Sequence, residues 1–170
     1  MTTDVPNDPE RANGVDPDVD MHVQAQRREL AGHPLDVLGA IAVGGVIGAE
    51  ARYGIGLAWP HGPSGWPWAT LLINVSGCLL IGVLMVVITE FVDPHRLVRP
   101  FLGVGILGGY TTFSTYTVDA ISLADDARPG LAVAYLVVTP VVAVLACALG
   151  AGATRLAARL AGVRRPGNGR

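Results

Sequence analysis

Four apolar runs, each long enough to cross a lipid bilayer, limit the folds open to this chain more than any other feature. They cover about residues 35–59, 68–89, 99–123 and 130–154, and the charged residues, only 15% of the chain, gather mainly between and outside them. A helix crosses the hydrocarbon core with about 20 mainly apolar residues. We therefore predict an all-α integral membrane protein with four transmembrane helices.

The two ends of the chain differ in composition from the part between them. Residues 1–33 are rich in Asp and Pro and lack the basic start and short apolar segment of a signal peptide. We expect them to form a disordered cytoplasmic tail. Residues 158–170 make a second, basic tail. Residues 34–157 are then expected to form a single four-helix domain.

Four spans place both termini on one side of the membrane, and the arginines are unevenly divided between the two sides. Cytoplasmic loops of membrane proteins carry an excess of Lys and Arg. Only Arg128 lies on the far side, with Arg52 near the end of the first span. Both termini are therefore predicted to be cytoplasmic. The arginines on the side of the termini are Arg27, Arg28, Arg96, Arg99, Arg155, Arg159, Arg164 and Arg165.

Several functional classes are disfavoured by what the sequence lacks. No basic face with interleaved aromatic residues occurs, so a nucleic-acid partner is not expected. No Ser/His/Asp set, P-loop or cluster of metal ligands occurs, and all four histidines fall in tails or loops, so we do not expect an enzyme. Cys78 and Cys147 lie inside apolar runs and are expected to be small buried hydrophobic residues.

The third run has a composition that a lipid-facing helix would not have. Gly108 and Gly109 precede residues 110–117, in which seven of eight side chains carry a hydroxyl. The pattern predicts a helix broken in mid-membrane, because non-helical backbone at that depth must face protein or a water-filled cavity. Such a break frees carbonyl groups that suit Na⁺, whereas a helix that restarts after it directs its N-terminal amides toward anions.

Other polar residues in the spans allow two interpretations each. The Asn74 side chain can donate to an anion or can join two helices by hydrogen bonds. Phe113 and Tyr116 share a helix face; their positive ring edges favour a small anion, although packing is the simpler role. Hydroxyl groups on one face can replace the water around an ion. The residues that would supply them are Ser114, Thr115, Tyr135 and Thr139.

Three segments, one in each of the first three spans, resemble the motifs of a known family. Residues 44–53, GGVIGAEARY, resemble the GGxxGAxxRY motif of the bacterial fluoride channels of the Fluc/CrcB family. Residues 70–77, TLLINVSG, resemble its GTLxVNxxG segment, with Ala69 in place of the first glycine. Residues 105–116, GILGGYTTFSTY, resemble its GxxGGxTTFSTF segment, which is highly specific.

The resemblance implies a fluoride-specific channel that works as an antiparallel, dual-topology dimer and lets fluoride leave the cell passively. It also implies a structural Na⁺ at the dimer interface, held by backbone carbonyls of Gly108 and Thr111 from each subunit. Phe113 and Tyr116 would be the ring-edge aromatics and Asn74 the amide donor. The polar track would comprise Ser114, Thr115, Tyr135 and Thr139, with Asp119 at its end and Arg52 in the vestibule.

Two departures from the family pattern bear on these expectations. Tyr116 stands where Phe is common, so its hydroxyl is expected either to donate to the ion or to narrow the path. The arginine asymmetry conflicts with insertion in both orientations, since that bias sets orientation. We therefore expect one preferred orientation, and either a homodimer or a heterodimer with an oppositely oriented paralogue.

The main alternative is a small four-helix exporter coupled to protons, which needs a carboxylate within the membrane. Glu50 is the candidate in the first span, but it lies near the end of that span, close to Arg52. An ion pair between these two residues is the simpler explanation. A membrane scaffold without transport would explain the apolar runs but not the hydroxyl-rich segment.

Overall fold

The computed structural model describes residues 34–60, 62, 65–92 and 94–163. The predicted N-terminal tail and four of the counted arginines (Arg27, Arg28, Arg164 and Arg165) lie outside the described residues. The chain divides into two units, Met1–Leu35 and Asp36–Arg170. The first is described only at its last two residues, so everything below concerns the second.

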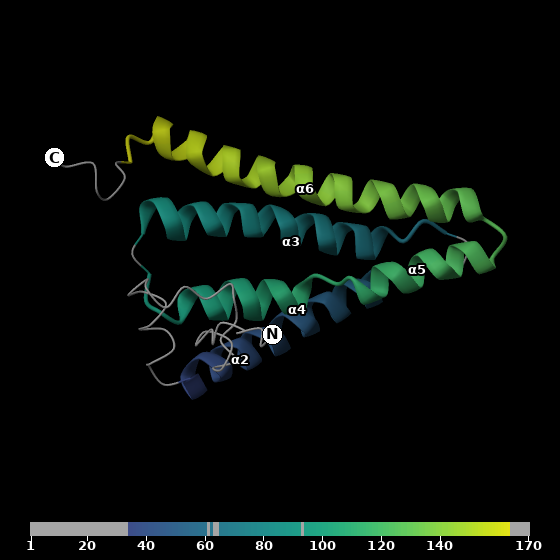
Figure 1. The fold of residues 1–170 in the computed structure, drawn as a ribbon, viewed down its shortest axis with the longest axis horizontal. Helices are drawn as coiled ribbons and strands as arrows, with labels where there is room; N and C mark the ends of the chain where they lie inside the picture. Colours follow the sequence, from purple (N-terminus) through teal and green to yellow (C-terminus); the bar gives the residue numbers. More distant parts are fainter. Residues whose placement is uncertain (1–33, 61, 63–64, 93, 164–170) are drawn as a thin grey trace, which may run out of the picture. The chain divides into compact units, whose positions relative to one another are not determined.

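All regular structure in the described residues is helical, as the apolar runs predict, and each run corresponds to one helix or to consecutive helical elements (Figure 1). The first run is α2, the second is α3 continued by η2, the third comprises η3, α4 and α5, and the fourth is α6. The elements η2 and η3 are π-helical. The bounds are α2 Pro34–Ala58, α3 Trp68–Val86, η2 Val87–Phe91, η3 Arg99–Leu107, α4 Gly108–Tyr110, α5 Ser114–Asp125 and α6 Pro129–Leu160.

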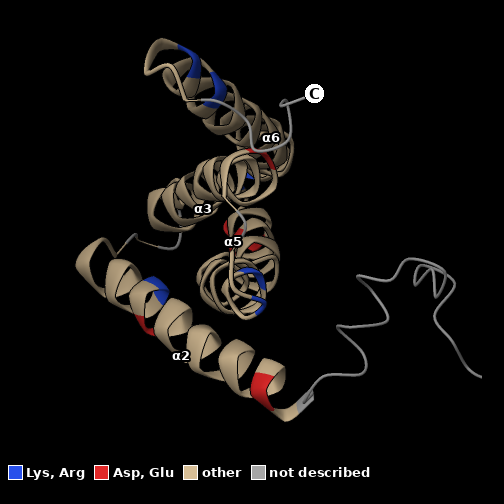
Figure 2. Ribbon diagram, turned by 90° about the vertical axis from the view of Figure 1, so that its left-hand side faces the viewer, with Lys and Arg blue, Asp and Glu red and all other residues tan. Residues whose placement is uncertain are grey.

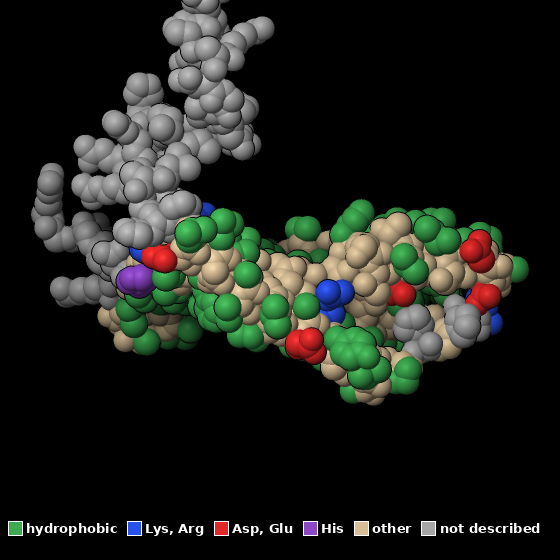
Figure 3. Space-filling model, turned by 90° about the horizontal axis from the view of Figure 1, so that it is seen from below, with side chains coloured by type: hydrophobic (Ala, Val, Ile, Leu, Met, Phe, Trp, Pro, Cys, Tyr) green, Lys and Arg blue, Asp and Glu red, His purple; other side chains and the backbone are tan. Residues whose placement is uncertain are grey.

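Among the described helices, two are long and apolar enough to cross a membrane by length and composition, Trp68–Phe91 and Pro129–Leu160. The third run does not qualify as one helix because it is divided into elements of 9, 3 and 12 residues. In α2, Glu50, Arg52 and many glycines dilute the apolar character. Hydrophobic side chains nevertheless cover much of the face shown in Figure 3, as is typical of surfaces that meet lipid or another protein.

The α3 and α6 helices run parallel and in close contact, with α5 beside them (Figures 1 and 2). Two glycines permit this approach. A Cβ atom on Gly82 would lie 2.1 Å from the Cys147 carbonyl oxygen, and one on Gly150 would lie 2.3 Å from that of Leu79. Small residues serve this purpose where lipid offers no hydrophobic drive for helix association. The core forms where α3, α5 and α6 meet, around Leu71, Tyr116, Ala120, Leu123, Ala132 and Tyr135.

The α2 helix packs on η3 and α4 through facing glycines. A Cβ atom on Gly48 would lie 2.1 Å from the Ile106 carbonyl oxygen, and one on Gly109 would lie 2.4 Å from that of Gly45. Gly44 and Gly105 approach each other in the same way. Gly44 and Gly48, four residues apart, therefore form a small-xxx-small contact that lets the two backbones approach closely.

Two salt bridges join the helices at the end where η2 and α6 finish. Arg96 pairs with Asp36 at 2.7 Å, and Arg155 pairs with Glu90 at 2.6 Å. Arg128 lies at the other end of α6, next to the turn after α5. Among the described residues, the arginines assigned to the side of the termini therefore lie at one end of the helices, and Arg128 lies at the other.

Candidate functional site

The third run loses its helical structure at the hydroxyl-rich segment. The α4 helix ends at Tyr110 and α5 begins at Ser114, and the backbone of Thr111 is extended, with φ −76° and ψ 158°. Thr111 still closes the last turn, since its amide and its Oγ1 both donate to the Leu107 carbonyl at 3.0 Å. Residues 111–113 therefore form a short non-helical link between two helical elements.

The side chain of Asn74, on α3, forms hydrogen bonds with the backbone of this link. Its Nδ2 donates to the Thr112 carbonyl at 2.9 Å, and its Oδ1 accepts from the Thr112 amide at 2.8 Å. The Asn74 side chain thus replaces the two helical partners that Thr112 lost at the interruption. Gly77, almost one turn further along α3, leaves room for the Thr111 side chain, because a Cβ atom there would lie 2.3 Å from Thr111 Cγ2. Of the two roles expected for Asn74, the structure shows the hydrogen bonds that join α3 to the third run.

Thr112 organises the start of α5. Its Oγ1 accepts from the Thr115 amide at 3.1 Å and so satisfies one of the first amides of α5. The same oxygen donates to Thr115 Oγ1 at 3.0 Å and lies 3.3 Å from Ser114 Oγ. The hydroxyl groups of Ser114 and Thr115 are therefore gathered around Thr112. Sequence reasoning did not single out Thr112, although a Thr shortly ahead of a helical segment can signal the start of a helix.

A groove of about 320 Å³ opens beside the interruption. Phe113, in its wall, is 79% exposed, whereas Tyr116 is 8% exposed; their ring centroids are 5.7 Å apart. Thr139 contributes a buried hydroxyl from α6, one helical turn beyond Tyr135. The groove is lined by Asn74, Cys78, Thr111, Thr112, Phe113, Tyr116, Thr139, Pro140 and Ala143.

The hydroxyl of Tyr116 bonds to the backbone of α6. It donates to the Leu136 carbonyl at 2.6 Å. In a regular helix the amide of residue 140 would bond that carbonyl, but residue 140 is Pro, inside α6, and has no N–H. Tyr116 therefore satisfies a carbonyl that Pro140 leaves without its helical donor. The two roles expected for this hydroxyl, donating to the ion or narrowing the path, stay predictions.

A second polar cluster lies on the other side of the tyrosines. Thr70 Oγ1 donates to Asp119 Oδ2 at 2.6 Å, and Tyr135 Oη lies 3.5 Å from the same oxygen. All three side chains are buried, at 4%, 9% and 0% exposure respectively. Tyr135 also meets the edge of Trp66, at a centroid distance of 5.4 Å. Tyr116 and Tyr135 connect the cluster to the groove, with centroids 5.3 Å apart. Thr70 and Trp66 were not identified from the sequence, because only tertiary contact brings them to Asp119 and Tyr135.

Arg52 and the glycine pair lie at the α4 side of the interruption. Arg52 Nε donates to the Gly109 carbonyl at 3.1 Å. The Gly108 carbonyl does not receive its usual donor, since the Thr112 amide is bonded to Asn74. Carbonyls of this kind fit a hard cation, which prefers oxygen ligands. In the part of the chain that the structure describes, no group of three His, Cys, Asp or Glu residues offers another metal site.

Glu50 does not join this site. It is exposed on α2 and is absent from the lining of the groove. Within the described ranges, no salt bridge links it to Arg52, so the expected ion pair is not formed; Arg52 binds the Gly109 carbonyl instead. The structure thus separates the exporter's candidate carboxylate from the polar groups around the groove.

Comparison with known proteins places these features in a family. Residues 39–151 match the family described as CrcB-like protein, Camphor Resistance (CrcB). The chain is 48% identical over 124 residues to "Fluoride-specific ion channel FluC 2" of Streptomyces avermitilis, covering 73% of this chain and 78% of that one. It is 53% identical over 119 residues to "Fluoride-specific ion channel FluC 1" of Streptomyces coelicolor, covering 70% and 77%. A protein of Chloroflexus aurantiacus named "Fluoride-specific ion channel FluC" is 41% identical over 117 residues, covering 68% and 93%.

Proposed function

This chain belongs to the CrcB-like family, and from that premise we propose that it is a fluoride-specific channel that lowers cytoplasmic fluoride by passive efflux. Fluoride enters a cell as neutral HF and dissociates inside, so an open path for the anion drains the trapped pool. The relatives compared above are named fluoride-specific ion channels. The groove beside the helix interruption is the observation in this chain that supports it.

The groove offers hydrogen-bond donors to a small anion, which the surface of a purely apolar helix does not. Thr139 contributes a buried hydroxyl there, and Asn74 has a second amide hydrogen beyond the one given to Thr112. The Phe113 ring has a positive edge that attracts an anion. The N-terminus of α5 adds a favourable dipole. An anion that leaves water here is met by hydroxyl, amide and ring-edge hydrogens in place of its hydration shell.

The remaining polar residues extend this route on either side. We assign Asp119, with Thr70 and Tyr135, to the end of the polar track, since the two tyrosines connect that cluster to the groove. Arg52 is assigned to the vestibule by the family resemblance. Ser114 and Thr115 line the track in the same assignment, with Thr112 holding their hydroxyls in place.

We further propose that two subunits complete the path as an antiparallel dimer in the inner membrane. Phe113 is 79% exposed on the single subunit and lines an open groove whose walls are mainly apolar, which supports a second subunit covering this face. The arginine distribution supports one preferred orientation with both termini in the cytoplasm, and in that case the antiparallel partner is an oppositely oriented paralogue. A reporter at the C-terminus should then signal only from the cytoplasm; equal signal from both sides would contradict a single orientation and support dual insertion.

The Gly108 and Thr111 carbonyls are proposed to hold a structural Na⁺ between the subunits. Bound there, the cation would be coordinated by carbonyl oxygens that lack amide donors at the interruption. Replacing Na⁺ by a large organic cation during purification should lower the melting temperature of the dimer. An unchanged melting temperature in thoroughly Na⁺-free buffer would count against this assignment and leave the anion path unaffected.

Fluoride efflux from liposomes that contain the purified protein tests the main proposal, with chloride efflux as the reference. We expect rapid fluoride-selective efflux from the wild type and none from Phe113→Ile. Phe101→Ile, in η3, is the matched control and should retain efflux. Efflux that needs a pH gradient and disappears in Glu50→Gln would favour the proton-coupled exporter. Wild-type protein that passes neither ion alone, but passes fluoride after a second chain is added, would identify a heterodimer.

A further inference from the structure

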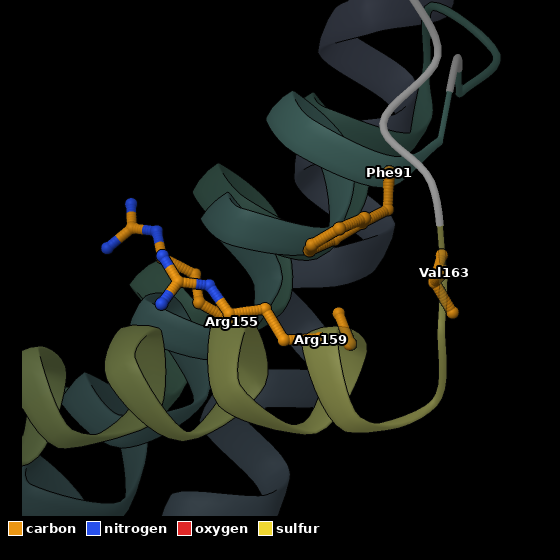
Figure 4. A pocket seen from close by; sticks show the side chains of 5 residues that line it. Phe91, Arg155, Arg159 and Val163 are labelled. Carbon is orange, nitrogen blue, oxygen red and sulfur yellow. The ribbon is translucent and has the colours of Figure 1, made fainter. Parts of the chain in front are cut away.

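A pocket of about 140 Å³ lies at the end of α6, far along the chain from the interruption (Figure 4). Arg155 and Arg159 form its basic part, and both extend from the same side of α6. Its remaining walls are apolar: Phe91, the last residue of η2, Ala158 and Val163. Both arginines lie beyond residues 39–151, the part of the chain that matches the family model.

The end of α6 shapes this pocket. The chain reverses at Gly162, where φ is +67°. The Val163 amide then donates to the Ala158 carbonyl at 3.0 Å, and the Gly162 amide donates to the Arg159 carbonyl at 3.2 Å. This pair of bonds is a Schellman motif, which folds the chain back over the last turn of the helix. Val163 therefore comes to lie over Ala158 and closes one side of the pocket.

The two guanidinium groups keep most of their hydrogen-bonding capacity. Arg155 and Arg159 are four residues apart and so share a helix face. Arg155 pairs with Glu90 through Nε, at 2.6 Å, and a guanidinium group has four further N–H donors. Glu90 neutralises one of the two cations, and the trio retains a net positive charge. Planar guanidinium groups bind phosphate oxygens through paired hydrogen bonds.

The position of the pocket along the helices indicates which ligands it can contact. It lies where both apolar helices, Trp68–Phe91 and Pro129–Leu160, come to an end, at the depth of lipid headgroups for a chain that spans the bilayer. Basic pockets between transmembrane helices on the cytoplasmic side are a recurrent site for anionic headgroups. The apolar walls match the glycerol and first methylene groups of a lipid and offer nothing to free phosphate.

We propose that this pocket binds the phosphodiester group of an anionic phospholipid, with Arg159 and the terminal nitrogens of Arg155 as donors and Phe91 and Val163 against the glycerol and acyl chain. Arginine in the last helical turn also complements the helix dipole, but that role needs neither a concave site nor an aromatic wall. The inference rests on membrane placement and not on the ion that the chain conducts.

Native mass spectrometry of the full-length protein in detergent tests this proposal, with phosphatidylglycerol titrated against phosphatidylcholine of the same acyl chains. We expect the wild type to prefer phosphatidylglycerol and Arg159→Gln to lose about fivefold in its affinity, the usual effect of one basic residue near an anionic surface. Arg128→Gln, at the opposite end of α6, is the matched control for net charge and should lose less than twofold.

Three results would overturn the proposal. The first is equal affinity of the wild type for the two lipids. The second is an equal loss in Arg128→Gln and Arg159→Gln, which would indicate a general effect of charge. The third is displacement of phosphatidylglycerol by an equal concentration of inorganic phosphate, which would identify a site for free anions. Arg159→Lys keeps the charge, so its affinity for phosphatidylglycerol should fall between those of the wild type and Arg159→Gln. A melting temperature equal to that of the wild type shows that each variant is folded. Since no ion flux is measured, these outcomes are independent of the proposed channel function.

Discussion

Removal of one hydroxyl, in Tyr116→Phe, tests whether the contact between Tyr116 and Leu136 stabilises α6. The Tyr116 hydroxyl donates to the Leu136 carbonyl at 2.6 Å, and Pro140 cannot supply the helical donor for that carbonyl. In the variant, the carbonyl loses this donor in a partly buried setting. Pro140→Ala restores an amide at the position from which a helix normally bonds residue 136. The same substitution at Tyr116 should therefore cost much less when Pro140 is also changed.

The size of the effect follows from the cost of an unpaired polar group. A buried acceptor left without a partner costs about 1–3 kcal/mol, whereas exchange of one adequate partner for another is nearly neutral. We expect Tyr116→Phe to lower the free energy of unfolding by about 1–2 kcal/mol in the wild-type background and by less than about 0.5 kcal/mol in Pro140→Ala. The resulting coupling energy of about 1 kcal/mol lies in the range measured for residues in contact.

Reversible unfolding in mixed detergent micelles, followed by tryptophan fluorescence, gives the four free energies of this cycle. Tyr53→Phe is the matched control, because Tyr53 is 64% exposed on α2; it should cost nothing measurable in either background. Equal costs of Tyr116→Phe in the two backgrounds would refute the link between Tyr116 and Pro140. Fluoride flux per folded Tyr116→Phe channel should stay within about twofold of wild type, since the hydroxyl hydrogen is already donated to the Leu136 carbonyl.

Three further predictions concern the interruption, the turn after α5 and the packing of α3 on α6. Asn74→Ala leaves both backbone groups of Thr112 unpaired and should destabilise the protein by about 2–4 kcal/mol and abolish fluoride flux, measured by unfolding and liposome efflux. Ala127 adopts a left-handed conformation with φ 57°, so Ala127→Gly should raise the free energy of unfolding by about 0.5–1 kcal/mol; a decrease would contradict the strain. Gly82→Ala should cost about 1–3 kcal/mol by forcing α3 from α6, whereas Gly39→Ala, with open space around it, should not.

The helices themselves could be predicted from the sequence with few errors, because long apolar runs have few alternatives to helix. The interruption was also expected, since Gly108 and Gly109 followed by hydroxyl residues are poor helix formers at that position. Its ends, at Tyr110 and Ser114, depend on where Asn74 reaches the Thr112 backbone. That contact joins residues 38 positions apart, so no local pattern specifies it.

The candidate site was predictable only in part, for a related reason. Spacing placed Phe113 with Tyr116, which do lie close together, with ring centroids 5.7 Å apart. It gave no direction for the Tyr116 hydroxyl, because the carbonyl that accepts it is freed by a proline on another helix. Thr70 and Trp66 were missed since neither belongs to the hydroxyl-rich segment. Their importance comes from contacts with Asp119 and Tyr135 that form only when α3, α5 and α6 pack.

The geometry of Asn74 changes how loss of flux in its variants is to be interpreted. A residue that only donated to the anion could be replaced by another donor with altered selectivity and little loss of stability. Asn74 instead holds both the amide and the carbonyl of Thr112, and Thr112 in turn gathers Ser114 and Thr115 and starts α5. Asn74→Asp keeps the acceptor and loses the donor, so it should separate the two roles. Loss of stability together with flux would identify a positioning residue, whereas normal stability with lost flux would identify a direct ligand of the anion.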